Sequence, residues 1–314
     1  MTETASKSSS RLVEWMRPRR RLIGWTALLS VVAVVLVVVL ARWLRGTPGG
    51  EAFIADYPGI VPPPEGTPVG IPAWLGWQHF LNSFFLLLIV RTGFQLRSKQ
   101  RPPGFFTRDN TRWPRTKRAP RRLGIFLWFH LWLDAFWILN GAVYVVVLFA
   151  TGQWLRIVPT DWAVVPNALS AALQYASLDW PTENSWVVYN SLQQLAYFAI
   201  VFIASPLALL TGLRLSSVWP PEGALVRAFP EKLARAVHYP VMLFFLGFVF
   251  VHVVLVFTTG ALVKLNQMYL ARDADDWLGF IVFALSVVVM AVAWVLAKPP
   301  LLKRIAAKGG TVRG

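Results

Sequence analysis

The sequence predicts an all-α fold, a polytopic membrane bundle of about six transmembrane helices. Of the 314 residues, 56% are hydrophobic, which is more than a soluble chain of this length buries. Six separate runs are long and apolar enough to cross a hydrocarbon layer of ~30 Å as helices. None of these runs has the short alternating pattern of a membrane barrel strand. Helices are therefore the expected spanning elements.

Residues 74–260 contain four of the six runs and are expected to form a four-helix core. One additional helix is expected before the core, at 22–44, and one after it, at 277–297. The first run could instead be a cleaved signal, but its length and the lack of a small-residue cleavage site favour a retained helix. The predicted runs are Leu22–Leu44, Trp74–Leu96, Leu123–Ala150, Trp186–Leu213, Val237–Thr259 and Trp277–Ala297.

Basic residues predict the orientation of the chain. The formal net charge is +16, and most lysines and arginines lie in four places: the tails 1–21 and 298–314 and the connections 91–122 and 214–235. Alternate connections are acidic. By the positive-inside rule, both basic tails and the basic connections face the cytoplasm. Topology and contact with anionic lipid explain the charge, so we expect a lipid bilayer as partner and no nucleic acid.

The chain contains four histidines, and all of them lie in apolar runs. His238 and His252 are fourteen residues apart, a spacing that returns to nearly the same helical face, about 40° away, after ~21 Å of rise. His79 and His130 lie one each in two other runs. The predicted orientation puts His79 and His252 in the outer half of the membrane, and His130 and His238 in the inner half. The four residues therefore form two pairs by depth.

Paired histidines at this spacing predict two b-type haems. An imidazole inside hydrocarbon is an unsatisfied polar group unless its ring nitrogens find partners, and iron is such a partner. Two axial imidazoles occupy both faces of a haem iron, which favours electron transfer over oxygen activation. The absence of cysteine excludes thiolate-bound clusters and covalently attached haem. One metal ion shared by His238 and His252 is excluded by their separation along the helix.

These residues resemble the bacterial di-haem cytochrome b subunits of formate dehydrogenase, nickel–iron hydrogenase and thiosulfate reductase. The resemblance covers about residues 74–260 and is carried by His79, His130 and the stretch HYPVMLFFLGFVFVH from His238 to His252. It implies that His79 and His252 ligate one haem iron and His130 and His238 the other. It also implies a bacterial cytoplasmic (inner) membrane, quinone as a diffusible substrate, and a soluble redox partner, with a molybdopterin enzyme favoured by analogy.

Two departures from the family pattern concern the extra helices at 22–44 and 277–297. Because of the first extra helix, the four-helix core crosses the membrane in the opposite direction to a core whose first helix begins on the cytoplasmic side. In the formate dehydrogenase type, quinone meets the haem held by the first and fourth core helices. Here that is the haem of His79 and His252, which the predicted orientation places outside. The sequence therefore does not decide which side of the membrane binds quinone and the partner.

Other polar residues in the runs are candidates for cofactor binding. Asp134, four residues after His130, is expected to point back at that ring and to accept its N–H or relay protons, or else to be a neutral buried acid. Asn190, Gln193 and Gln194 are expected to bind outer propionates or quinone carbonyls, with interhelical hydrogen bonding equally open. Candidate partners of the inner propionates are arginines at the inner rim: Arg91, Arg97, Arg122 and Arg235.

Glycines in three of the runs would admit a flat macrocycle close to the backbone, although glycine is as common at ordinary helix contacts. They are Gly93, Gly141 and Gly247.

The sequence thus predicts a membrane cytochrome b that carries electrons between the quinone pool and a partner redox subunit, with substrate catalysis in the partner. The rival hypothesis is a transporter or channel in which Asp134, Asn140 and the glutamines line a polar path. A second rival is a membrane anchor without haem. The transporter or channel predicts a colourless protein and no need for the histidines to pair, and the anchor would tolerate the loss of all four histidines.

Overall fold

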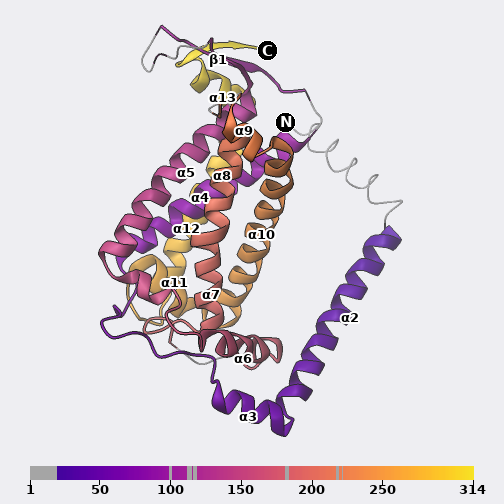
Figure 1. Cartoon of the computed structure of the whole chain (residues 1–314), viewed down its shortest axis with the longest axis vertical. Helices are drawn as coiled ribbons and strands as arrows, with labels where there is room; N and C mark the ends of the chain where they lie inside the picture. The colour runs from indigo at the N-terminus through magenta and orange to yellow at the C-terminus, as the bar shows by residue number, and fades with distance from the viewer. Residues whose placement is uncertain are drawn as a thin grey trace. The chain divides into compact units, whose positions relative to one another are not determined.

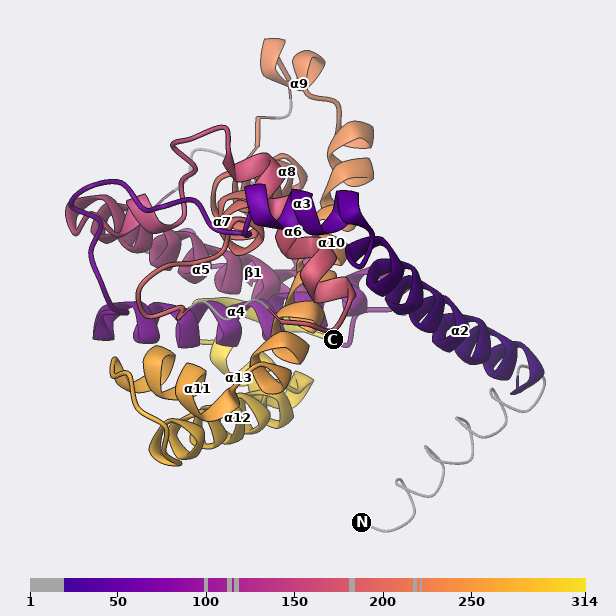
Figure 2. The ribbon, with the colours of Figure 1, turned by 90° about the horizontal axis from the view of Figure 1, so that it is seen from below.

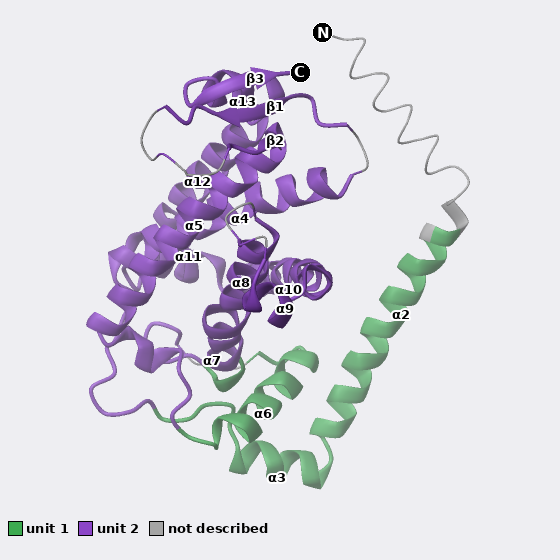
Figure 3. Ribbon diagram, turned by 45° about the horizontal axis from the view of Figure 1, so that its top comes forward, with its two compact units in different colours: residues 1–62, 161–183, 190–192 green, residues 63–160, 184–189, 193–314 purple. Residues whose placement is uncertain are grey.

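The computed structural model describes residues 20–98, 101–111, 115, 119–180, 184–216, 219–220 and 222–314. Nearly all of the regular structure is α-helical, which confirms the predicted fold class. The basic tail expected at 1–21 lies outside the described residues except for its last two. The described chain divides into two compact units, coloured separately in Figure 3. Unit 1 comprises residues 20–62, 161–180 and 190–192, and unit 2 the remaining described residues.

Six helices in the described residues are long and apolar enough to span a membrane, so the chain is a multi-pass membrane protein. Their apolar side chains are largely exposed, as the hydrocarbon layer requires; Leu285 in the last span, for example, is 60% exposed. The fifth span starts at Glu231, one to two turns before the predicted Val237, so His238 lies inside the helix. The spans are Gly24–Arg45, Ala73–Arg97, Ile125–Ala150, Ser191–Leu215, Glu231–Thr258 and Leu278–Leu296.

Unit 1 joins the first span to two shorter helices. The Oγ1 of Thr47 accepts a hydrogen bond from Gly50 N at 3.1 Å and thereby caps the first short helix. At the end of the span, Nε of Arg42 donates to the carbonyl of Ser177 at 3.0 Å. The sequence analysis treated both short helices as parts of connections. The helices of unit 1 are α2 (Arg20–Arg45), α3 (Pro48–Asp56) and α6 (Val164–Ala176).

Unit 2 contains the other five spans, except for Ser191 and Leu192 at the start of the fourth, and these spans run roughly alongside one another in Figure 1. The fourth span is not a regular α-helix, because a π-helical segment interrupts it. There, Oγ of Ser205 donates to the carbonyl of Ile200, five residues back, at 2.8 Å. Such segments occur often near functional sites. The elements are α4 (Ala73–Arg97), α5 (Ile125–Ala150), α7 (Ser191–Phe198), η3 (Ala199–Ala204), α8 (Ser205–Leu215), α10 (Glu231–Thr258) and α12 (Leu278–Leu296).

One end of the unit 2 bundle has a small antiparallel sheet, with strand order β2-β1-β3. Phe106 pairs with Leu123 on one side and with Val312 on the other. Phe106 also packs with Ile125 of α5 and Leu302 of the last helix. The C-terminal segment, expected as a tail, is therefore folded onto the connection between α4 and α5. These elements are β1 (Phe105–Arg108), β2 (Arg122–Gly124), α13 (Pro299–Ala306) and β3 (Gly310–Arg313); α9 (Ala224–Ala228) lies at the same end.

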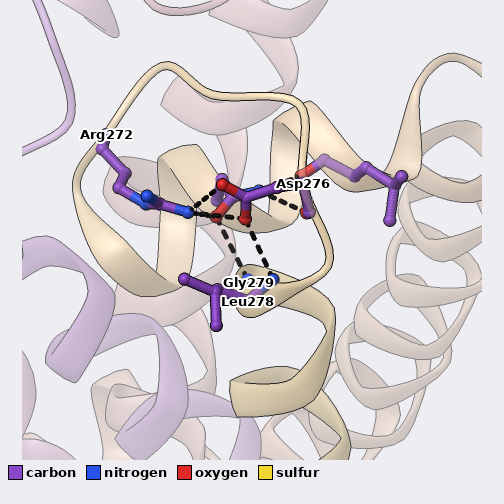
Figure 4. A network of polar contacts seen from close by, with 6 residues as sticks. Arg272, Asp276, Leu278 and Gly279 are labelled. Atoms are coloured by element: carbon purple, nitrogen blue, oxygen red, sulfur yellow. Dashed lines mark hydrogen bonds and ion pairs between the residues drawn. The ribbon is translucent and has the colours of Figure 1, made fainter.

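The opposite end of the bundle has two short helices. One of them, α11, packs beside α12, as Figure 2 also shows. Asn266 of α11 is fully buried, and its Oδ1 accepts from Gly279 N at 3.1 Å and from Arg272 Nη2 at 2.9 Å. Asp276 accepts from Arg272 and from Leu278 N, so these residues fix the turn between the two helices (Figure 4). The short helices are η2 (Gln153–Arg156) and α11 (Ala261–Leu270).

The carboxylate of Asp276 makes this turn sensitive to acid. The hydrogen bond from Leu278 N, followed by Arg272, lowers the pKa of Asp276 below its ordinary 3.8. A group with a lowered pKa stabilises the fold fully above its unfolded pKa and loses that effect as the pH falls through the folded pKa. We expect Asp276→Asn to lower the Tm slightly at pH 7 and to lower it less near pH 3. Asp275→Asn, at an exposed neighbour, is the control; an equal loss in both variants would contradict the assignment.

Candidate functional site

The four histidines lie on three neighbouring spans of unit 2 and form the candidate site. His79 is in the second turn of α4, His130 in the second turn of α5, and His238 and His252 are both on α10. His79 and His252 are called the outer pair below, and His130 and His238 the inner pair. The names follow the predicted depths and mark opposite ends of the bundle.

The structure brings the outer pair into contact. The ring centroids of His79 and His252 are 6.1 Å apart. A metal–imidazole bond is about 2 Å long, so two imidazoles on opposite sides of one metal ion have centroids about 6 Å apart. Nδ1 of His79 is buried and has no hydrogen-bond partner among the described residues. The separation fits two axial ligands of a single metal.

Aromatic side chains surround the outer pair. Phe248 stacks on His252 with centroids 5.6 Å apart and planes 10° apart. Tyr269 meets His79 edge-on at 6.0 Å. Tyr269 belongs to α11, which packs so closely on α4 that a side chain at Gly76 would collide with the carbonyl of Met268. The sequence analysis did not identify Tyr269, because α11 lies in a connection that showed no spanning pattern.

Each inner histidine is held by a threonine on a neighbouring span. Oγ1 of Thr92, on α4, is 2.7 Å from Nδ1 of His130. Oγ1 of Thr211, on α8, is 2.8 Å from Nδ1 of His238. Both threonines are buried, at 1% and 2% exposure. Both are followed by glycine in the sequence, and a Cβ at Gly212 would lie 3.5 Å from Cε1 of His238. The same Thr–Gly pair therefore supports both rings.

The threonine contacts select one tautomer of each imidazole. Oγ1 of Thr92 also bonds to the carbonyl of Leu88 at 2.9 Å, and Oγ1 of Thr211 to that of Leu207 at 2.6 Å. A hydroxyl has a single hydrogen. If each threonine donates to its own helix, its oxygen must accept from the imidazole Nδ1–H. Nε2 then keeps its lone pair, which is the form of histidine that binds a metal.

The helices α4 and α10 approach each other beside His130 of α5. A Cβ at Gly93 would lie 3.5 Å from Sδ of Met242 and 4.0 Å from Cε1 of His130. Met242 is one helical turn beyond His238 on α10, so the two inner histidines face the same region.

Asp134 lies beside His130 at the inner pair, and its predicted role toward the ring or in proton relay stays a prediction. Its Oδ2 is 3.6 Å from Nε2 of His130, which is longer than a hydrogen bond. The partner of Nδ1 is Thr92, not Asp134. The Thr92 contact crosses between helices and has no sequence signal comparable to a spacing of four on one helix. Asp134 therefore adds a carboxyl group close to the imidazole of His130.

The four candidate arginines do not gather in one place. Arg91 donates to the carbonyl of Trp294 on α12 at 2.5 Å and lies over its indole ring. Arg122 lies over Phe105, and Arg235 pairs with Glu231. Arg97 lies over the ring of Tyr239, 3.8 Å from its centroid. Tyr239 directly follows His238 in α10. Of the four arginines, Arg97 therefore contacts the residue next to a member of the inner pair.

Of the candidate residues Asn190, Gln193 and Gln194, the first and the last contact the connection before α7. Nδ2 of Asn190 donates to the hydroxyl of Tyr175 in unit 1 at 2.8 Å, and Asn190 is fully buried. In unit 2, Nε2 of Gln194 lies 3.5 Å from the carbonyl of Val158. Gln193 precedes Gln194 in α7. The proposed role of these three residues toward a cofactor stays a prediction.

A buried arginine, missed by the sequence analysis, organises the outer connections of unit 2. Arg156 is 5% exposed, and its guanidinium donates to four backbone carbonyls, at Pro68, Gly70, Ser185 and Trp186. It also lies over the ring of Tyr189, 4.6 Å from its centroid. Burial raises the pKa of Tyr189, and Arg156 opposes this shift.

Two glycines of the spans leave room next to the backbone. A Cβ at Gly141 or at Gly247 would meet no atom within 4 Å. Gly141 is eleven residues after His130 and lies on the same face of α5. Gly247 lies between the two histidines of α10 in sequence but on the opposite face of that helix and exposed, so only Gly141 leaves room on a histidine-bearing face.

Among the described residues, no group of three or more His, Asp or Glu side chains is placed to hold a metal ion. The candidate metal ligands therefore come as pairs of histidines. A haem supplies four equatorial nitrogens of its own and needs two axial ligands from the protein. The donor set therefore fits haem better than a bare ion. Comparison of the chain with protein-family models, curated proteins and solved structures finds no match.

Proposed function

We propose that this chain is the membrane cytochrome b subunit of a respiratory oxidoreductase, which carries electrons between the quinone pool and a soluble redox partner. The observation that carries the proposal is the outer pair, whose ring centroids are separated by 6.1 Å inside the membrane bundle. The inner pair supports it, since both its rings are held with Nε2 available for a metal. The resemblance to the bacterial di-haem cytochrome b subunits implies the same arrangement.

His79 and His252 would hold one b-type haem, and His130 and His238 the other. A haem with two imidazole ligands accepts and donates single electrons and leaves no position open for oxygen. The protein residues orient the ligands and exclude water: Thr92 and Thr211 fix the inner rings, and Phe248, Tyr269 and the packing of α11 enclose the outer ones. Substrate catalysis would belong to the partner, by analogy a molybdopterin enzyme.

We place the chain in a bacterial cytoplasmic membrane with both termini in the cytoplasm. The distribution of lysine and arginine supports this orientation. The sheet supports it as well, because β1 and β3 join the basic connection after α4 to the basic C-terminal segment, so both belong on one side. Quinone would bind near one of the two pairs.

The haem content of the purified protein tests the proposal. We expect a b-type α-band in the reduced-minus-oxidised spectrum and two haems per chain by pyridine haemochrome assay. Cells should be supplied with a haem precursor, and protein isolated without pigment should be titrated with haemin. Protein that stays colourless and binds no haemin would refute the proposal and favour a transporter or an anchor.

A further inference from the structure

The two histidine pairs have different polar surroundings. At the inner pair, both Nδ1 atoms contact a buried threonine hydroxyl, at 2.7 and 2.8 Å. At the outer pair, Nδ1 of His79 is buried without a hydrogen-bond partner among the described residues. His252 instead stacks on the apolar ring of Phe248. In the tautomer with a proton on Nδ1, the inner ligands donate N–H hydrogen bonds to these hydroxyls, whereas Nδ1 of His79 has no such acceptor among the described residues.

An acceptor at Nδ1–H changes the electronic character of a metal-bound imidazole. It draws the proton away from the ring and makes Nε2 a stronger donor to the metal. A stronger donor stabilises ferric iron relative to ferrous iron and lowers the reduction potential. The threonine oxygens are accepting partners because their own hydrogens are directed at Leu88 and Leu207. The hydrogen bonds thus favour the oxidised state at the inner pair.

Charged and polar groups near the pairs act in the same direction. The carboxyl of Asp134 lies 3.6 Å from Nε2 of His130, so its oxygens favour the more positive, ferric state there. The ammonium of Lys264, on α11, interacts with His252 and disfavours the added positive charge of ferric iron at the outer pair. Such interactions are strong where water is excluded.

We infer that Thr92 and Thr211 are positioning residues that make the inner haem the lower-potential centre of the two, so that electrons at equilibrium reside on the outer haem. This inference rests on the proposed function. Each threonine acts through its histidine, and the two act alike because the Thr–Gly pair occurs once beside each inner ring.

Potentiometric titration of the α-band in valine variants tests the inference. The double variant T92V/T211V keeps the side-chain shape but loses both hydroxyl acceptors. We expect its lower midpoint to rise, with about a tenfold change in the reduction equilibrium, or about 59 mV for one electron, and its upper midpoint to stay in place. T92S/T211S should restore the original midpoints. Thr258→Val is the matched control, because among the described residues that exposed hydroxyl bonds to the backbone carbonyls of Val254 and Leu255 and to no histidine.

A second measurement assigns the midpoints to the pairs. His79→Ala should leave the inner haem alone, and its midpoint should match the lower of the two wild-type values. His238→Ala, which should leave the outer haem, provides the same test if the first variant does not fold. The inference is overturned if the valine variants leave both midpoints unchanged or move only the upper one, or if the haem left by His79→Ala has the higher midpoint. A wild-type protein without haem would instead refute the proposed function.

Discussion

A chain carrying both His79→Ala and His252→Ala is expected to retain one haem, whereas a chain carrying His79→Ala and His130→Ala is expected to retain none. The reason is the pairing: the rings of His79 and His252 are in contact, and His130 lies at the other end of the bundle. Loss of one axial ligand removes half of the protein's bonds to an iron and should weaken haem binding by at least about 100-fold. Loss of the second ligand of the same pair then costs little more.

Haem per chain in the purified variants measures this effect. The losses should be non-additive within a pair and additive between pairs. Phe250→Ala is the control, since this residue lies on α10 between the histidines but is 72% exposed. Size-exclusion profiles should show that each variant remains monodisperse. Pairing as proposed is wrong if His79→Ala/His252→Ala loses both haems from a monodisperse protein, or if His79→Ala/His130→Ala retains one.

Replacement of Arg156 by methionine is expected to destabilise unit 2 by about 3 kcal/mol or more. The guanidinium is buried and is the shared donor of four carbonyls from two separate connections. Methionine of similar length would leave these acceptors without their donor. Arg156→Lys should recover only a small part of the loss, because an ammonium lacks the planar fork of donors that contacts several carbonyls at once.

Thermal unfolding in detergent, followed by fluorescence-detected size exclusion, measures the loss. Arg235→Met is the matched control: it removes an exposed ion pair between Arg235 and Glu231 of α10, so little change in Tm is expected. Proteolysis of the 151–189 connection should accelerate in the Arg156 variants and not in the control. An Arg156→Met protein with the Tm of the control would show that the connections are held by other contacts.

The short elements outside the spans were missed for identifiable reasons. α6, α11 and α13 are eight to thirteen residues long, and their apolar faces are too narrow to resemble a span. For α13 a signal existed, because Pro299 and Pro300 precede an apolar and basic pattern typical of a helix start. The pairing of β1 with β3 joins segments about two hundred residues apart, and nothing local in either four-residue strand specifies the other.

The sequence by itself determined the membrane class, the six spans and the placement of four histidines in them, because hydropathy and helical spacing are local properties. Only the tertiary structure decided which groups surround each imidazole. Thr92 reaches His130, Tyr269 reaches His79 and Arg156 reaches four distant carbonyls across elements whose separation in sequence carries no information about contact. A buried polar group takes whichever partner the packed helices bring within about 3 Å, and that choice exists only once the chain is folded.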